Sequence, residues 1–213
     1  MKDYQVYLFD FDGTVVDTEE SLLCVFQSAF EAVGLTCDRK EVVACMKRSL
    51  QETVEVHKIV EQNRIDAFLK ALFSKLDSPG SLSLVKLFPD AEKVINNLKN
   101  AGKLVGLVTN NSEKHVRLVF NMLGIERCFD VITGNDENTR PKPYPDMIDS
   151  TLEKLGWSDK GQVVYVGDAV QDLETAKNAD IDGILIDREG LAPGMGITSL
   201  LDLLDSSLPR ASD

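Results

Sequence analysis

The stretch Gln5-Val6-Tyr7-Leu8-Phe9-Asp10-Phe11-Asp12-Gly13-Thr14 decides how this 213-residue chain folds. Its first half is apolar and rich in residues that favour strands, a pattern that predicts a buried strand. The strand ends in two carboxylates, Asp10 and Asp12, and then in Gly13, which permits a tight turn and leaves room for a ligand. Carboxylates in such a place cost desolvation energy unless a cation neutralises them. The stretch alone therefore fits either an Asp-rich turn or a site for a hard divalent cation, most often Mg²⁺ where phosphate is also present.

The composition is that of an ordinary globular protein with an acidic surface. Hydrophobic residues make up 43% of the chain and charged residues 27%, and 213 residues suit one large domain or one domain with an insert. The formal net charge of −12 argues against a nucleic-acid-binding protein. It also means that an anionic substrate would need local positive charge at its binding site.

The cysteines and the N-terminus favour a cytoplasmic protein. No two cysteines form a C-x-x-C pair and no histidine cluster accompanies them, so we expect small buried residues in a reducing compartment. The first strand follows Met1-Lys2-Asp3-Tyr4 directly, without a signal-peptide pattern, and no apolar run is long enough to span a bilayer. We expect no membrane partner.

A helical block follows the opening stretch. Apolar residues recur at helical spacing over residues 21–33, and Gly34 is expected to end that helix. Three more helical segments follow, at residues 39–46, 50–63 and 65–77. Ser78-Pro79-Gly80-Ser81 has the composition of a break. Because no strand pattern occurs between residues 16 and 84, we predict a helical domain at residues 16–85, inserted into a larger domain.

From residue 88 onward, helical and strand patterns alternate. Further apolar, strand-like runs occur at residues 104–108, 129–133, 162–166 and 183–186, with helical patterns between them. Such alternation predicts βαβ units and hence a parallel sheet with helices on both faces. The predicted fold class is α/β, with a doubly wound, Rossmann-like sheet formed by residues 1–15 and 86–213 and an inserted helical cap domain.

Polar residues follow the predicted strands at places that converge in such a sheet. Asp10 and Asp12 end the first strand, Thr109 ends the second, Lys142 lies in the loop after the third, and Asp168 ends the fourth. In open α/β sheets, ligands bind beyond the carboxyl ends of the strands. We expect these five side chains to meet there, although each alone is explained as well by a turn, a helix cap or a solvated charge.

Together these residue types are suited to phosphoryl transfer. Asp10 can be the nucleophile, because carboxylates form acyl phosphates, and Asp12 can protonate the leaving oxygen and later activate water. Asp10, Asp12 and Asp168 are the predicted metal residues, with a backbone carbonyl and waters completing the shell of Mg²⁺. Thr109 and Lys142 would bind phosphate oxygens, and such positioning and charge neutralisation account for most of the catalysis of phosphoryl transfer.

Three further residues have two interpretations each. The backbone around Gly13 either donates N–H groups to a phosphate or only forms a turn. Asn110 either lines the phosphate pocket or caps the next helix. Asp172 is either a partner of Lys142 or of a metal-bound water, or an ordinary acid in the first turn of a helix.

The four polar segments resemble the motifs of the haloacid dehalogenase superfamily. Asp-x-Asp-Gly-Thr matches residues 10–14, the Thr after an apolar strand matches Thr109, Lys before Pro matches Lys142-Pro143, and Gly-Asp-x-x-x-Asp matches residues 167–172. Order and spacing agree over nearly the whole chain. The resemblance implies that Asp10 is the nucleophile, Asp12 the acid and base, and Mg²⁺ the cofactor, and that a helical cap follows the first strand. Dehalogenases of this family lack the second Asp of the first motif, so the presence of Asp12 argues against that branch.

The resemblance also suggests where the substrate is selected. In capped members similar to phosphoglycolate phosphatase, a loop between the first cap helices faces the active site. Lys47 and Arg48 fall in that loop. They either bind an anionic group of the substrate beyond its phosphate or are ordinary surface charges.

The predicted function is a cytoplasmic, Mg²⁺-dependent phosphatase that hydrolyses a small phosphorylated metabolite through an aspartyl-phosphate intermediate, as a monomer or homodimer. The first alternative is a phosphomutase of the β-phosphoglucomutase type, in which a sugar hydroxyl instead of water receives the phosphoryl group. A regulatory phospho-acceptor would lack the inserted cap. A silent binding protein is not supported either, because no expected catalytic position is substituted.

Overall fold

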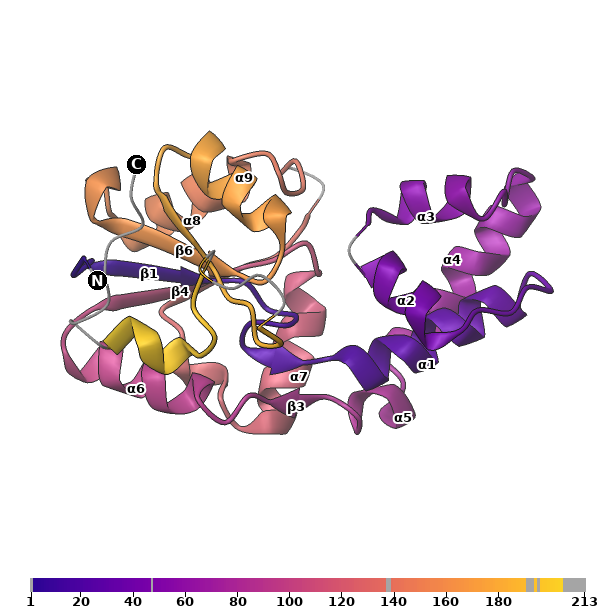
Figure 1. Cartoon of the computed structure of the whole chain (residues 1–213), viewed down its shortest axis with the longest axis horizontal. Helices are drawn as coiled ribbons and strands as arrows, with labels where there is room; N and C mark the ends of the chain where they lie inside the picture. Colours follow the sequence, from indigo (N-terminus) through magenta and orange to yellow (C-terminus); the bar gives the residue numbers. More distant parts are fainter. Residues whose placement is uncertain (1, 47, 137–138, 191–193, 195, 205–213) are drawn as a thin grey trace. The chain divides into compact units, whose positions relative to one another are not determined.

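The computed structural model describes residues 2–46, 48–136, 139–190, 194 and 196–204. The chain divides into two compact units, Met1–Val16 with Leu87–Asp213, and Asp17–Lys86. Each unit has a hydrophobic core of its own. The larger unit holds the central sheet, and the smaller one is helical (Figure 1).

In the described part of the larger unit, five parallel strands form the sheet, in the order β5-β4-β1-β6-β7. They are β1 (Val6–Phe9), β4 (Leu104–Val108), β5 (Val131–Thr133), β6 (Val163–Gly167) and β7 (Asp182–Leu185). In the register of the sheet, Phe9 lies opposite Leu107 on one side and Val166 on the other. The residues that follow these three positions therefore emerge at one edge, which we call the carboxyl edge.

Helices lie on both sides of this sheet, as Figure 1 shows. On one side are α8 (Asp146–Leu155) and α9 (Val170–Asn178), and on the other are α6 (Ala91–Asn100) and α7 (Glu113–Leu123). Short 3-10 helices occur at Glu126–Cys128, Lys160–Gln162 and Leu200–Leu204. The predicted α/β class, a doubly wound parallel sheet, is confirmed.

Local sequence signals position the helix that follows the second motif. The Ser112 hydroxyl accepts a hydrogen bond from the backbone N–H of His115 and so caps the start of α7. Gly124 ends the helix with a φ of 75°, a left-handed conformation that favours glycine. Both ends of α7 are thus fixed by local residues, and the short loop that precedes the helix carries Thr109 at the carboxyl edge.

Among the residues that the structure describes, five helices form the smaller unit. They are α1 (Glu19–Glu31), α2 (Arg39–Met46), α3 (Leu50–Val56), α4 (Gln62–Leu76) and α5 (Pro79–Leu82). α1 packs along α4, and the buried rings of Phe30 and Phe68 meet edge to face with centroids 5.2 Å apart. The two-residue strands β2 (Val16–Asp17) and β3 (Lys86–Leu87) pair where the chain leaves the larger unit and returns to it.

Several details differ from the sequence predictions. The helix expected at residues 50–63 ends at Val56, and Lys58 has a φ of 54°, which no helical residue adopts. The predicted break at residues 78–81 is instead the start of α5, with Ser78 as the N-cap and Pro79 as the first helical residue. The absence of strands between residues 16 and 84 was also a wrong prediction, because β2 forms there.

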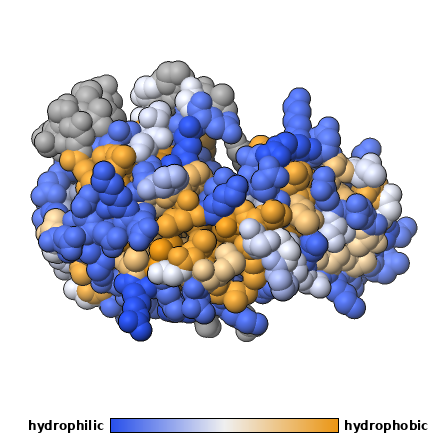
Figure 2. All heavy atoms as spheres, turned by 90° about the horizontal axis from the view of Figure 1, so that it is seen from below, coloured by the Kyte–Doolittle hydropathy of each residue, from blue (hydrophilic) through white to orange (hydrophobic). Residues whose placement is uncertain are grey.

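The cysteines are free, but they are not all buried as the sequence suggests. Cys45 is buried, whereas the other three are partly exposed: Cys24, Cys37 and Cys128. Within the described part of the chain, no helix is both long enough and apolar enough to cross a membrane. In the space-filling view, hydrophilic residues cover much of the surface, with apolar residues exposed among them (Figure 2).

Candidate active site

A buried lysine joins two aspartates at the carboxyl edge. Lys142 Nζ donates to Asp10 Oδ1 at 2.7 Å and to Asp172 Oδ1 at 2.6 Å. The side chains of Lys142 and Asp10 are each 7% exposed, and that of Asp172 is 1% exposed. Burial alone would lower the pKa of Lys142, but the two carboxylates raise it well above its ordinary value. The lysine therefore stays charged and links β1, α9 and the loop before α8.

Tyr165 of β6 completes this buried group. Its hydroxyl donates to the carbonyl oxygen of Val108 at 2.9 Å, and its oxygen lies 3.3 Å from Lys142 Nζ and 3.2 Å from Asp172 Oδ1. Burial raises the pKa of the Tyr165 hydroxyl well above its ordinary value, so the group is a neutral phenol. The sequence analysis missed Tyr165. The available signal was one polar aromatic residue in the aliphatic run of β6, two positions before Gly167.

Three carboxylates at this edge are close enough to share a metal ion. One oxygen from each of Asp10, Asp168 and Asp172 lies within 4.8 Å of the others. Burial raises the pKa of Asp10 well above its ordinary range, opposed by Lys142 and increased by the negative charges of the neighbouring acids. Asp168 is an exposed residue, yet desolvation of its carboxyl group, with the charge of Asp172, raises its pKa to about 6.

These observations fit a hard divalent cation. The group holds more negative charge than Lys142 alone neutralises, and buried charges of one sign destabilise a fold unless a counter-ion is present. Carboxylate oxygens are the ligands that Mg²⁺ prefers in proteins. The acids that gather are Asp10, Asp168 and Asp172, whereas the predicted metal set contained Asp12 in place of Asp172.

Asp12 lies half-buried beside Asn111. Its Oδ2 accepts a hydrogen bond from Asn111 Nδ2 at 2.5 Å. The backbone N–H of Asn111 in turn donates to the Thr109 hydroxyl oxygen at 3.2 Å. Because that oxygen accepts, the hydroxyl hydrogen of Thr109 is the donor available to a phosphate oxygen. Asn111 thus connects the first and second motifs.

Asn110 and Gly13 have local structural roles. The side-chain oxygen of Asn110 accepts the backbone N–H of Lys142 at 2.8 Å, so Asn110 helps to position the lysine. The N–H of Gly13 donates to the carbonyl oxygen of Val16 at 2.9 Å, within the loop itself. Gly13 has a φ of 69°, and a Cβ there would lie 2.3 Å from Asp168 Oδ2, so no other residue fits.

The remaining predicted residues lie elsewhere or serve two purposes. Lys47 lies outside the described residues, and Arg48 is an exposed residue of the helical unit. Asp172 fulfils both interpretations: its Oδ1 binds Lys142, and its Oδ2 accepts the backbone N–H of Ala169 at the start of α9.

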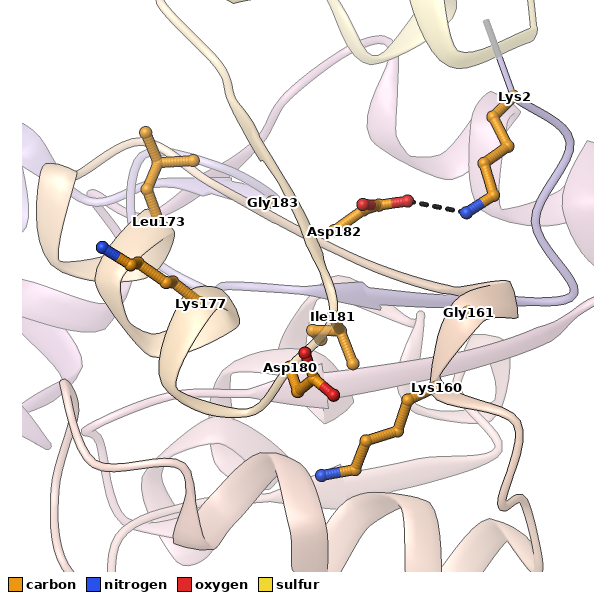
Figure 3. A pocket seen from close by; sticks show the side chains of 9 residues that line it. All are labelled: Lys2, Lys160, Gly161, Leu173, Lys177, Asp180, Ile181, Asp182 and Gly183. Carbon is orange, nitrogen blue, oxygen red and sulfur yellow. Dashed lines mark hydrogen bonds and ion pairs between the residues drawn. The ribbon is translucent and has the colours of Figure 1, made fainter. Parts of the chain in front are cut away.

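A hollow of about 490 Å³ lies at the opposite, amino edge of the sheet. Figure 3 shows three lysines around it, Lys2, Lys160 and Lys177. Lys2 pairs with Asp182 at 2.8 Å, and Lys160 pairs with Asp149 at 2.8 Å. Lys2 and Lys160 precede β1 and β6, and Asp182 begins β7, so the hollow is separate from the acidic group at the carboxyl edge.

Comparison with known proteins covers the segments that form the carboxyl edge. The haloacid dehalogenase-like hydrolase family matches residues 7–186, a span that includes all of the motif residues. The chain belongs to this family. The predicted recognition is therefore confirmed, and so is the predicted class of enzyme, a hydrolase of phosphoric monoesters.

Individual relatives extend over nearly the whole chain. Phosphoglycolate phosphatase of Escherichia coli (strain K12) is 27% identical over 224 residues, covering 95% of this chain and 86% of the relative. A haloacid dehalogenase-like family hydrolase from Streptococcus pneumoniae has a TM-score of 0.78 at 21% identity, covering 96% of this chain and 91% of the other. CbbY from Rhodobacter sphaeroides, solved in complex with xylulose-1,5-bisphosphate, has a TM-score of 0.74 at 22% identity, covering 94% and 96%. At these identities the two structures show a shared fold.

Proposed function

We propose that this chain is a Mg²⁺-dependent phosphatase that hydrolyses a small phosphorylated metabolite through a phosphoryl group carried on Asp10. The observation that supports this most directly is the buried group in which Lys142 joins Asp10 to Asp172 beside Asp168. An acidic nucleophile next to one fixed cation and one cation site suits a phosphate ester, whose oxygens carry the negative charge. The phosphoglycolate phosphatases among the relatives support the same class of substrate.

The first step transfers the phosphoryl group to the enzyme. A carboxylate oxygen of Asp10 forms a bond to phosphorus as the bond from phosphorus to the leaving oxygen breaks. Asp12 gives its proton to that oxygen, so an alcohol leaves. Lys142 opposes the rise in the pKa of Asp10 and so favours its carboxylate form. With the Thr109 hydroxyl it binds the oxygens that do not react.

The second step returns the enzyme to its starting state. Asp12, now ionised, takes a proton from a water molecule whose oxygen attacks the phosphorus. The bond from phosphorus to Asp10 breaks, and inorganic phosphate leaves. Mg²⁺, held by Asp10, Asp168 and Asp172, would neutralise phosphate charge in both steps. The predicted contribution of Asp12 to metal binding stays a prediction.

The test is hydrolysis of p-nitrophenyl phosphate, with Mg²⁺ and with EDTA, by the unchanged chain and by Asp10→Asn. We expect release that needs Mg²⁺ and that is lost in the variant, while circular dichroism shows both proteins folded. Activity that survives in Asp10→Asn would contradict the nucleophile assignment. Phosphoglycolate, sugar phosphates and nucleotides would follow as a substrate panel.

The phosphomutase alternative shares the first step and differs in the acceptor of the phosphoryl group. Recovery of inorganic phosphate in an amount equal to the sugar phosphate consumed would exclude it for that substrate. The other predictions concern partners and location: no nucleic acid or membrane, a monomer or homodimer, and the cytoplasm. They stay predictions.

A further inference from the structure

Arg188 holds the backbone of the loop that carries the first motif. It follows β7 at the carboxyl edge of the sheet. Its Nε donates to the carbonyl oxygen of Gly13 at 3.1 Å, and its Nη2 donates to the carbonyl oxygen of Thr14. These are the two residues directly after Asp12. The contact joins positions more than 170 residues apart in sequence.

The other side of the guanidinium group is fixed as firmly. Nη1 donates to both carboxylate oxygens of Asp90, each at 3.1 Å. The guanidinium carbon lies 3.6 Å from the centre of the Phe88 ring, a cation–π contact. The Arg188 side chain is 18% exposed and that of Asp90 is 11% exposed, so water screens this pair only weakly. The planar guanidinium group has five N–H donors on three nitrogens, so it can bind two carbonyl oxygens and a carboxylate at once. A lysine has a single nitrogen and cannot reach all three in this arrangement.

Asp90 is itself anchored to a third segment. Its Oδ2 accepts the Ser199 hydroxyl at 2.7 Å and the backbone N–H of Leu200 at 2.8 Å. Burial alone would raise the pKa of Asp90, but the hydrogen bonds from Arg188, Ser199 and Leu200 lower it below its ordinary value. The carboxylate is therefore charged at neutral pH. Arg188 is therefore paired with a carboxylate that is itself held in place by Ser199 and Leu200.

The first-motif loop has few side-chain contacts of its own at this point. Gly13 has no side chain, and the buried Thr14 Oγ1 has no hydrogen-bond partner among the described residues. The hydrogen bonds from Arg188 to the carbonyl oxygens of Gly13 and Thr14 therefore do much to fix this loop to the rest of its unit. The N–H of Phe88 adds a second tie, to the carbonyl oxygen of Val15 at 3.1 Å.

We infer that Arg188 is a positioning residue for Asp12. By fixing the carbonyls of Gly13 and Thr14, it sets the direction in which the preceding Asp12 presents its carboxyl group to the leaving oxygen. Asn111 holds one oxygen of that carboxyl group, and Arg188 holds the backbone that carries it. Proton transfer needs hydrogen-bond reach, and small displacements of a catalytic group are costly in rate. This inference rests on the proposed function, in which Asp12 is the acid and base.

The experiment compares two leaving groups in Arg188→Lys. The variant keeps the charge near Asp90 but cannot bind both carbonyls. An alkyl alcohol leaves only if it is protonated, whereas p-nitrophenolate leaves with little help. The measured quantity is kcat/KM, because it reports the step in which the leaving group departs. The substrates are p-nitrophenyl phosphate and phosphoglycolate, or the alkyl phosphate of the panel that the unchanged enzyme hydrolyses fastest.

We expect kcat/KM for the alkyl phosphate to fall about 10- to 100-fold, and that for p-nitrophenyl phosphate to fall less than about threefold. Arg117→Lys is the matched control, because Arg117 of α7 forms exposed ion pairs with Glu113 of the same helix and with Glu126 of the 3-10 helix that follows. It should leave both values unchanged. Asp90→Asn removes the negative charge that pairs with Arg188 and keeps an acceptor for Ser199 and Leu200. In this variant, too, kcat/KM should fall more for the alkyl phosphate than for p-nitrophenyl phosphate, but by a smaller factor.

The outcomes separate this inference from the proposed function. An unchanged enzyme that hydrolyses neither substrate would overturn both. Activity that depends on Asp10, with an equal loss for both substrates in Arg188→Lys, would overturn only the positioning role and assign Arg188 to stability. If Arg188→Lys does not fold, Asp90→Asn decides the question by the same ratio of the two kcat/KM values.

Discussion

The two edges of the central sheet carry lysine–aspartate pairs of nearly the same length in different surroundings. At the carboxyl edge, Lys142 binds Asp172 at 2.6 Å with side chains 7% and 1% exposed. At the amino edge, Lys2 binds Asp182 at 2.8 Å with side chains 41% and 50% exposed. Water screens the second pair and not the first, so only the first can hold a strong field around a reacting group. Burial, not distance, distinguishes the candidate site from the charged hollow opposite it.

The largest effect is expected from Lys142→Met. The variant leaves Asp10 and Asp172 buried without their cation, which typically costs about 3–5 kcal/mol of the free energy of unfolding. Hydrolysis of p-nitrophenyl phosphate should fall below detection. Urea unfolding, followed by circular dichroism, measures the free energy of unfolding. A loss below about 1 kcal/mol would mean that the buried pair behaves as a surface pair.

Tyr165→Phe should have an intermediate effect. The variant lacks the hydroxyl that hydrogen-bonds Val108, Lys142 and Asp172. A buried polar group left without its partner lowers the free energy of unfolding by about 1–3 kcal/mol. We expect kcat to fall about tenfold as Lys142 loses a neighbour that holds it in place.

Tyr4→Phe at the amino edge is the matched control. Tyr4 is also buried, and burial together with its hydrogen bond to Asp182 raises its pKa above the ordinary value. The variant should be destabilised while its kcat stays unchanged. Equal losses of kcat in the two variants would show that stability alone explains the Tyr165 effect.

The acidic group should make the stabilising effect of Mg²⁺ depend on pH. The pKa of Asp168 is raised to about 6 in the folded chain. Because the unfolded carboxyl group ionises first, the metal-free protein should lose stability as the pH rises from about 4 to 6. Mg²⁺ binds the ionised oxygens, so its addition should raise the Tm more at pH 7.5 than at pH 5.

Asp168→Asn supplies the control for this prediction. An amide does not ionise, so the part of the pH dependence that comes from this residue should vanish in the variant. A Tm shift with Mg²⁺ that is the same at both pH values in the unchanged protein would contradict the prediction.

The smallest effect is expected from Lys2→Met. Exposed ion pairs contribute about 0–1 kcal/mol, because water already solvates both partners. The free energy of unfolding should change by no more than about 1 kcal/mol. The rate of hydrolysis should stay the same. A loss comparable to that of Lys142→Met would remove the distinction between the two edges.

Much of the candidate site could be predicted because parallel strands place their ends together. The hydrophobic runs gave the strands, and the alternation with helices made the sheet parallel, so Asp10, Thr109 and Asp168 had to emerge at one edge. Lys142 was found because its motif is local and ends in proline. Short-range patterns such as these survive in a single sequence.

Other contacts have no local pattern. Tyr165 reaches Val108 across 57 positions of sequence, and Arg188 reaches Gly13 across 175. Asp172 was left open between two interpretations because either is compatible with the first turn of a helix. The break expected at residues 78–81 became a helix because Ser78 caps it and Pro79 fits its first turn.

The sequence by itself determined the fold class, the family and the candidate acids, because periodicity and motif spacing depend on neighbours along the chain. Only the tertiary structure decided which of these acids are buried and that Asp10 and Asp172 share Lys142. It alone also showed that Tyr165 contacts this group and that Arg188 binds the first-motif loop. The physical reason is that burial, and with it the strength of a charge, depends on segments that meet only after the chain has folded.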